Sequence, residues 1–245
     1  MFPLPDYLRT VWGIFLFLVI SSAILYYALS GLSYWYFFVL KKEKYHPKYK
    51  RNKDEIKMSM KWAMYSLLGN AVLTAPIHYL IDHGYTRVYF NISDFGWGWF
   101  FLSALVVLIV TETMIYWIHR WLHHPALYKH IHLKHHQFRK PTPWASVAFH
   151  PLDSFAQAFP HHLCAFLFPV HIVVYLSFLS FVTVWAVLIH DRVSFIPWKI
   201  VNYTGHHTAH HWYNKYNYGQ FFTIWDRIGG TYRDPDDLPA KALDI

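Results

Sequence analysis

A long uncharged segment near the start of the chain constrains the fold more than any other feature. No charged residue lies between Thr10 and Leu40, and the segment after Thr10 reads VWGIFLFLVISSAILYYALSGLSYWYFFVL. A helix of about 20 apolar residues crosses the hydrocarbon core of a bilayer, whereas a cleaved signal peptide has a shorter apolar region behind a basic start. We therefore expect a retained membrane span and an integral membrane protein.

Two more apolar stretches predict further spans. Residues 62–81 are weakly apolar and contain Pro76, so we expect a second span with a kink near that proline. Residues 97–118 are long enough as a helix to cross the hydrocarbon core and form the third predicted span. Glu112 lies inside this third span.

The region at about 155–189 is also apolar but admits two interpretations. A single span would place His190 and the histidines of 206–211 across the membrane from the other histidines. A hairpin that turns at 169–171 keeps them together, and its legs are too short for two full crossings. We therefore predict a re-entrant helical hairpin.

The distribution of charged residues predicts how the chain is oriented in the membrane. The formal net charge is +8, and nine Lys or Arg lie within residues 41–61 against three acidic residues. A basic cluster beside an apolar run is typical of a cytosolic loop, so the charge indicates membrane orientation and not nucleic-acid binding. We expect residues 41–61, His119 and Ile245 in the cytosol, and the amino terminus and residues 83–95 across the membrane.

The predicted fold is an all-α integral membrane protein with three spans, a re-entrant helical hairpin and a small cytosolic helical cap that carries the histidines. Residues 1–118 form the N-terminal transmembrane region, and residues 119–245 form the histidine-box catalytic region. Cys164 is the only cysteine, which excludes an intrachain disulfide and a cysteine-based metal site.

The chain contains 19 histidines, an unusually high number, and many of them lie in clusters along the sequence. The three clusters are His119-Arg-Trp-Leu-His123-His124, His132-Leu-Lys-His135-His136 and His206-His207-Thr-Ala-His210-His211. Positions i, i+3 and i+4 share a helix face, so we expect the three histidines of each HxxHH pattern to converge. A shuffled chain of this composition would contain HxxHH only about 0.1 times, so two copies indicate function.

Clustered imidazoles are neutral ligands for iron, zinc or copper, and eight or more of them exceed the needs of one ion. Two metals are implied. A carboxylate-bridged site of the ferritin type needs two Glu-x-x-His pairs, and only Glu43 with His46 matches. A zinc hydrolase is the alternative, although zinc sites use three or four ligands. A redox pair of irons that uses O2 beside a membrane would oxidise an unactivated C–H bond of a hydrophobic substrate.

The isolated histidines carry less information. We expect His46, His78, His83, His130 and His171 to be interfacial or loop residues. A non-catalytic metal carrier would place metal ligands along the spans, where few such residues occur.

The boxes HxxxH, HxxHH and HxxHH resemble those of the fatty acid hydroxylase and sterol desaturase superfamily of membrane di-iron oxygenases. The segments PTPWASVAFHPLDSFAQAFPHHLCAFLFPVH, LIHDRVSF and HHTAHHWYNKYNYGQFFTIWDRIGGTYRDP are similar to its sterol C5-desaturase (lathosterol oxidase) branch. The resemblance covers about residues 115–235, and residues 1–110 match in hydropathy only.

This resemblance implies a metal-ligand set of nine histidines. They are His119, His123, His132, His135, His136, His190, His207, His210 and His211. For His124, His150 and His206, a structural role and a role near the metals remain equally open. Ligating imidazoles need a partner for the second ring nitrogen, and the acids near the boxes are Glu112, Asp153, Asp191 and Asp226.

We expect Glu112, Asp191 and Asp226 to be the acids of the catalytic site. The alternatives are that Glu112 pairs with a cation near the cytosolic interface, and that Asp226 caps a turn or pairs with Arg227.

By the same resemblance, the protein uses two iron ions, O2, and electrons from NAD(P)H through cytochrome b5 or an equivalent donor. It would introduce a C5(6) double bond into a Δ7-sterol in the endoplasmic reticulum membrane, or in the inner membrane of a prokaryote, with a cytosolic active site. The expected partners are the bilayer, the sterol and the electron donor. A hydroxylase of the same superfamily, acting on a sterol, fatty acyl or sphingoid lipid, is the alternative.

Overall fold

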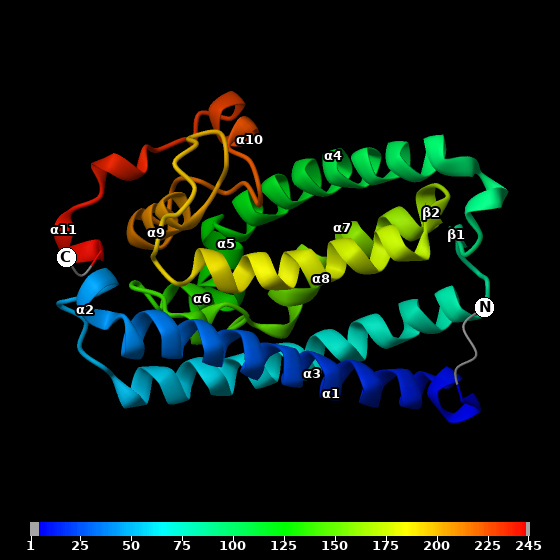
Figure 1. Ribbon diagram of the computed structural model, residues 1–245, viewed down its shortest axis with the longest axis horizontal. Helices are drawn as coiled ribbons and strands as arrows, with labels where there is room; N and C mark the ends of the chain where they lie inside the picture. Colours follow the sequence, from blue (N-terminus) through cyan, green and yellow to red (C-terminus); the bar gives the residue numbers. More distant parts are fainter. Residues whose placement is uncertain (1–4, 244–245) are drawn as a thin grey trace.

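The computed structural model describes residues 5–243 and is mainly helical (Figure 1). Five long helices lie side by side and alternate in direction along the chain. They are α1 (Val11–Tyr34), α3 (Lys53–Asp82), α4 (Gly96–Leu122), α7 (Pro151–Leu167) and α8 (Ile172–Ile189).

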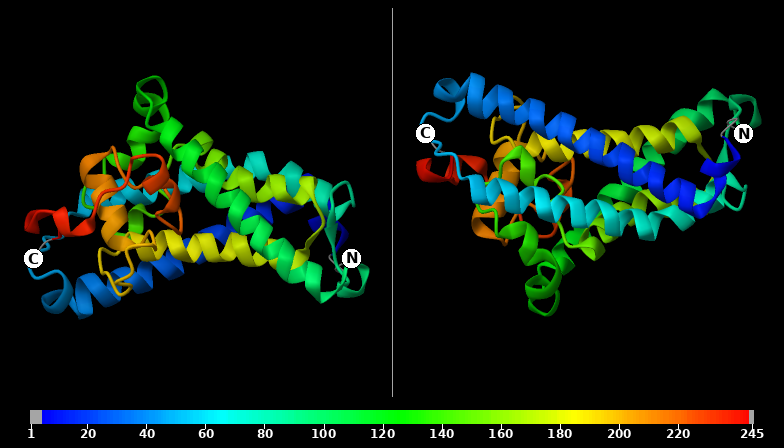
Figure 2. Two further views of the ribbon diagram at one scale, coloured as in Figure 1. Left: turned by 90° about the horizontal axis from the view of Figure 1, so that it is seen from above. Right: turned by 90° about the horizontal axis from the view of Figure 1, so that it is seen from below.

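The shorter elements gather at the two ends of this bundle. At one end lie α2 (Lys42–Tyr45), α5 (Pro125–Leu127), α6 (Leu133–His136), α9 (Thr204–Tyr213), α10 (Ile224–Ile228) and α11 (Ala240–Leu243). At the other end, β1 (Val88–Tyr89) and β2 (Val170–His171) form a small parallel sheet. The views from above and below show the same division (Figure 2). A cluster of short elements thus lies at one end of the bundle; that it forms a cytosolic cap stays a prediction, and Ile245 lies outside the described residues.

Three helices within residues 5–243 are long and apolar enough to cross a bilayer. They are Val11–Leu40, which joins α1 to the π-helical turn Trp35–Leu40, together with α4 and α8. The first and third predicted spans are therefore confirmed as apolar helices of spanning length. The second predicted span lies within α3, which is not among the three.

The composition of α3 explains this difference. Its first turns carry lysines of the basic cluster, and its buried face consists largely of small residues such as Ala63, Ser66, Ala71 and Ala75. Small residues allow close approach of neighbouring helices. At Gly69, an added Cβ would lie 2.3 Å from the Cβ of Pro151, so only glycine permits this contact with α7. The helix continues through Pro76.

Helices α7 and α8 form a helical hairpin with its turn at β2, and its re-entrant character stays a prediction. Val170 and His171 pair with Val88 and Tyr89 of β1, so the hairpin turn lies at the end of the bundle that holds residues 83–95. Of the two legs, α8 reaches spanning length with its 18 residues, whereas α7 is not among the candidate spans, in line with the expectation that the legs are too short for two full crossings.

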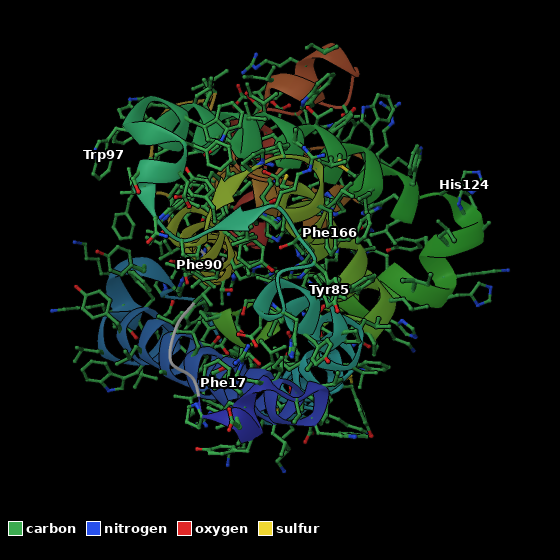
Figure 3. The ribbon with its side chains drawn as sticks, turned by 90° about the vertical axis from the view of Figure 1, so that its right-hand side faces the viewer. Phe17, Tyr85, Phe90, Trp97, His124 and Phe166 are labelled. Atoms are coloured by element: carbon green, nitrogen blue, oxygen red, sulfur yellow. The ribbon has the colours of Figure 1, made fainter. Side chains whose placement is uncertain are left out.

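The apolar core near the hairpin turn fixes these helices against one another. It contains Val107 of α4, Ala165 of α7, Val170, and Val174 of α8. Seen from this end, Phe166 lies near the middle of the molecule and Trp97 at its outer edge (Figure 3). The Trp97 side chain is 60% exposed, as expected for an aromatic residue at a membrane interface.

Candidate metal centre

The nine predicted histidines converge into two groups at the end of the bundle where α4 and α8 terminate. One group holds His119, His123, His132, His136 and His210, and the other holds His135, His190, His207 and His211. Within each group the candidate ligand nitrogens lie within 4.8 Å of one another. No other such group of three or more His, Cys, Asp or Glu occurs among the described residues.

The five-histidine group combines four segments. His119 lies in the last turn of α4, and His123 follows it one turn later. His132 ends a π-helical turn, His136 ends α6, and His210 comes from α9. The Nε2 atoms are 3.2 Å apart between His119 and His132, 3.1 Å between His132 and His136, and 2.9 Å between His136 and His210.

The four-histidine group is built from α6, the end of α8 and α9. The Nε2 atoms of His190 and His207 are 3.1 Å apart, as are those of His207 and His211. The ring of His135 lies 4.5 Å from that of His211, measured between centroids. Because His190 directly follows α8, the length of that helix places it beside the other boxes.

The HxxHH boxes do not converge as expected. In each HxxHH box, the first and last histidines, which are four residues apart, belong to one group. The middle histidine, His135 or His210, belongs to the other group. Successive helical residues point about 100° apart, so one short helix can supply ligands to two neighbouring sites. Each HxxHH box therefore supplies histidines to both groups.

In four of the nine histidines, a hydrogen bond at Nδ1 makes Nε2 the candidate ligand atom. The Nδ1 atom donates to a backbone oxygen in His119 (Tyr218, 3.0 Å), in His190 (Ala186, 2.6 Å) and in His210 (Tyr216, 2.7 Å). In His132, Nδ1 bonds the Asp153 carboxylate at 2.7 Å, and both side chains are fully buried. These partners place the proton on Nδ1 and leave the lone pair of Nε2 available.

This arrangement fits a pair of metal ions. Because His119 and His132 both carry their proton on Nδ1, no hydrogen lies between their Nε2 atoms, and two lone pairs face each other across 3.2 Å. A shared cation removes that repulsion. Two nitrogens bound at right angles to one ion at about 2.1 Å are about 3 Å apart, close to the spacings in both groups.

Burial keeps these imidazoles neutral. The pKa values of His135, His136, His207, His210 and His211 are lowered well below the usual range, first by burial and then by neighbouring histidines. The pKa of His190 is lowered to about 4 by burial. Metal ligation requires the neutral imidazole, so the site is prepared for it at neutral pH.

The three expected catalytic acids bind backbone amides near the site. Glu112 accepts from the Phe221 and Phe222 amides, at 2.9 and 3.1 Å. Asp226 accepts from the Tyr218 and Gly219 amides, both at 2.8 Å. These two acids hold the segment whose Tyr218 carbonyl orients His119.

The third acid, Asp191, accepts from the Val193 amide at 2.8 Å and from the Thr204 hydroxyl at 3.3 Å. It thereby joins the end of α8 to the start of α9, the two elements that carry His190 and His207. A catalytic role for the three acids stays a prediction. Asp153 is the acid that contacts a predicted ligand, and no local spacing could reveal this because 21 residues separate it from His132.

Two histidines whose roles were left open act as helix caps. The Nδ1 atom of His124 accepts from the Ala126 amide, and that of His150 accepts from the Leu152 amide at 3.2 Å. Each precedes a proline at the first position of a helix. His206 is buried in α9, outside both groups, with its ring beside that of Tyr232.

His46 lies in the loop that follows α2 and outside both histidine groups, as expected of a loop residue. Its side chain is fully buried, stacks on Phe38, and bonds the Asp191 backbone oxygen through Nε2 at 2.9 Å. It therefore ties the basic segment to the residue that follows His190. His162 lies outside the three histidine clusters, is buried in α7 and bonds the Tyr175 hydroxyl of α8 at 2.7 Å.

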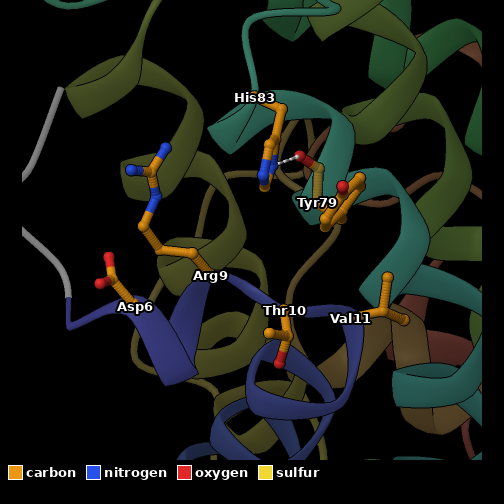
Figure 4. Close-up of a pocket in the computed structure, with 6 residues that line it drawn as sticks. All are labelled: Asp6, Arg9, Thr10, Val11, Tyr79 and His83. Carbon is orange, nitrogen blue, oxygen red and sulfur yellow. Dashed lines mark hydrogen bonds between the residues drawn. The ribbon is translucent and has the colours of Figure 1, made fainter.

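One pocket lies far from the two histidine groups. It has a volume of about 620 Å³ and lies between the start of α1 and the end of α3, at the opposite end of the bundle (Figure 4). Arg9 forms an ion pair with Asp82 there, at 2.8 Å, and His83 bonds the Tyr79 backbone oxygen. The pocket thus lies apart from both histidine groups.

Comparison with known proteins finds a family match that contains all nine histidines. The family model described as fatty acid hydroxylase matches residues 104–231. No solved structure matches the chain.

Several known proteins are similar to this chain over most of their length. Lathosterol oxidase of Homo sapiens is 38% identical over 244 residues, which cover 98% of this chain and 81% of that protein. Lathosterol oxidase of Rattus norvegicus is 42% identical, with coverage of 91% and 75%. The Delta(7)-sterol 5(6)-desaturase of Eremothecium gossypii is 42% identical, with coverage of 95% and 67%. The similarity therefore extends well beyond residues 115–235 and includes the N-terminal helices.

Proposed function

Because the chain belongs to the fatty acid hydroxylase family, we propose that it is a membrane-bound sterol C5-desaturase that introduces a C5(6) double bond into a Δ7-sterol. The observation that carries this proposal is the 38–42% identity, over at least 91% of the chain, to proteins named for that reaction. The two buried histidine groups supply the matching chemistry, because nine neutral nitrogen ligands suit a pair of redox metals.

We propose that each histidine group holds one iron ion. Bound iron would supply the redox chemistry that activates O2. The chain itself fixes the geometry, since α6 and α9 each contribute ligands to both groups and so set the spacing of the two ions. Asp153 and the three backbone oxygens keep the ligand rings in the correct orientation and tautomer.

The electron balance requires an external donor. Removing hydrogen from C5 and C6 of the sterol yields two electrons and two protons, whereas reduction of O2 to two molecules of water takes four of each. The other two electrons would come from NAD(P)H through a cytochrome b5-type protein, and the other two protons from solvent.

We further propose that the histidine-bearing end of the bundle faces the cytosol from the endoplasmic reticulum membrane. The basic segment 41–61 lies at this end, and residues 83–95 lie at the other. Residues 1–118 would form the membrane region, and residues 119–245 the catalytic region with its hairpin. The pairing of β2 with β1 favours a hairpin that reaches the far face over one that turns within the bilayer.

Sterol analysis of cells that lack C5-desaturation tests the proposal. Cells that express the protein should convert a Δ7-sterol to a conjugated 5,7-diene, which is measured by its ultraviolet absorption. A His210→Ala variant expressed at the same level should not. A product that only gains oxygen, or modified acyl chains beside unchanged sterols, would favour the hydroxylase alternative and reject desaturation.

A further inference from the structure

Tyr116 of α4 is a fully buried tyrosine whose hydroxyl begins a chain of hydrogen bonds that ends at a carboxylate. The Arg120 guanidinium donates to the Tyr116 hydroxyl oxygen at 2.8 Å. The Tyr116 and Thr231 hydroxyls are 3.0 Å apart, and Thr231 donates to the Asp226 carboxylate at 2.8 Å. Because Thr231 has one hydroxyl proton, which goes to Asp226, Tyr116 is the donor toward Thr231. The phenolic proton therefore has a directed path to Asp226.

The surroundings of this chain suit proton transfer. Asp226 also accepts from the Tyr218 and Gly219 amides, both at 2.8 Å, so each of its hydrogen bonds within residues 5–243 is donated to it. This is the pattern of an ionised carboxylate, which can receive a proton. At Gly229, an added Cβ would collide with the Tyr116 hydroxyl oxygen, so the turn leaves room for the phenol.

The Tyr116 ring is connected to the five-histidine group through the ring of Tyr218. The two tyrosine rings are 6.3 Å apart, measured between centroids. The Tyr218 ring lies 5.0 Å from the ring of His123 and 5.5 Å from those of His119 and His210. Such separations are typical of aromatic rings in contact. Because electron transfer slows steeply with distance, these contacts give a short path between Tyr116 and a metal held by the histidines.

A second set of rings leads from Tyr116 to the surface. The Trp117 ring lies 5.3 Å from that of Tyr116, and the Trp121 ring lies 6.5 Å from that of Trp117. Trp121 is 60% exposed. Neighbouring rings thus join the five-histidine group to the exposed surface of α4.

Two other tyrosines near the histidines lack a proton acceptor. The Tyr128 ring lies 5.3 Å from that of His123, and the Tyr218 ring is also beside this histidine. Within residues 5–243, neither hydroxyl has a hydrogen-bond partner. A phenol becomes strongly acidic when it loses an electron, so oxidation is favoured where the proton can leave. Of these three tyrosines, Tyr116 meets that condition.

We infer that Tyr116 is a redox-active tyrosine that supplies an electron to the metal centre when O2 has oxidised the metals and no sterol is bound. Without a substrate, an oxidised centre attacks its own ligands, and Tyr116 protects them. The inference rests on the proposed function, which supplies the oxidant.

The step balances in electrons and protons. One electron passes from Tyr116 through the Tyr218 ring to the metals, and the phenolic O–H bond breaks. The proton moves to the Thr231 oxygen as the Thr231 proton moves to Asp226, which leaves a neutral phenoxyl radical. An electron from the external one-electron donor, passing through Trp117, and the proton held by Asp226 then restore the phenol.

The test uses the full-length, iron-loaded protein in detergent. The protein is reduced with dithionite, freed of dithionite, mixed with O2 without sterol, and frozen for electron paramagnetic resonance. We expect a tyrosine radical, whose spectrum narrows in protein that contains ring-deuterated tyrosine. If protein that retains iron and desaturates a sterol gives no such radical, the inference fails and the proposed function stands. If the chain retains no iron, both fail.

Matched variants locate the radical. Tyr116→Phe removes only the phenolic oxygen and should reduce the signal at least tenfold. Thr231→Val removes the proton path and should have a similar effect, whereas Thr231→Ser keeps the hydroxyl and should retain at least half of the signal. Tyr128→Phe makes the same change beside His123 and should alter the signal less than twofold. An unchanged signal in Tyr116→Phe, or equal losses in Tyr116→Phe and Tyr128→Phe, would overturn the inference.

Mass spectrometry of the ligand peptides tests the protective role. After exposure to O2 without sterol, oxidation of His119 and His123 should be at least threefold higher in Tyr116→Phe than in the unmodified protein, and equal oxidation would reject protection. Iron content and melting temperature before exposure should be unchanged in every variant. If Tyr116→Phe does not fold, Thr231→Val decides, because it keeps the Tyr116 ring; a full radical signal in it would overturn the inference.

Discussion

Replacement of Asp153 by Asn probes how the chain holds a metal ligand. The two carboxylate oxygens have different partners: Oδ2 bonds Nδ1 of His132 at 2.7 Å, and Oδ1 accepts from the Gln157 amide at 2.7 Å. An asparagine has one oxygen and one NH2 group. It can therefore accept from one of these two donors, and its NH2 group must face the other.

The expected loss follows from these contacts. His132 loses a charged partner that favours the Nδ1 proton and the ring orientation needed at Nε2. Loss of such a partner of a metal-bound histidine weakens metal affinity by about 10- to 100-fold, which corresponds to about 1.4–2.8 kcal/mol. Full burial of both side chains excludes compensation by bulk water, so we expect the upper half of this range.

The assay is iron retained per protein during titration with a chelator, measured by elemental mass spectrometry. Asp94→Asn makes the same chemical change at an exposed position and should retain both ions. Adding Gln157→Glu to Asp153→Asn supplies an acceptor for the asparagine NH2 group, and should restore part of the lost affinity. Wild-type iron retention in Asp153→Asn would refute the assignment of Asp153 as the orienting acid.

Three other predictions follow from the site and the orientation. His210→Ala should reduce iron content toward one ion per chain and abolish desaturation, because it removes a ligand from one group only; two retained ions would contradict the assignment. His46→Ala should destabilise the protein by about 2–4 kcal/mol, seen as a lower melting temperature, because a buried ring and its hydrogen bond are lost. With Cys164 replaced, cysteines at Lys53 and Tyr85 should be labelled from opposite sides of sealed membrane vesicles; labelling of both from one side would reject the proposed orientation.

Local patterns in the sequence were sufficient for several features of the fold. The uncharged run after Thr10 and the run at 97–118 predicted helices of spanning length, because apolar length is a property of contiguous residues. The histidine spacings likewise identified eight of the nine residues that the structure gathers into the two groups, and the family resemblance of LIHDRVSF added His190. Helical periodicity carries such information within one turn.

Features that depend on contacts between distant segments required the tertiary structure. Spacing alone could not assign His135 and His210 to different groups, since that depends on how α6 and α9 pack together. Nor could it pair His132 with Asp153, because the two meet only after α7 folds back beside the second box. The burial of His46 had no local signal for the same reason: it accompanies a contact with Asp191, 145 residues away. Local sequence encodes helix length and facing residues, whereas the choice of partner for each buried polar group is made by packing between helices.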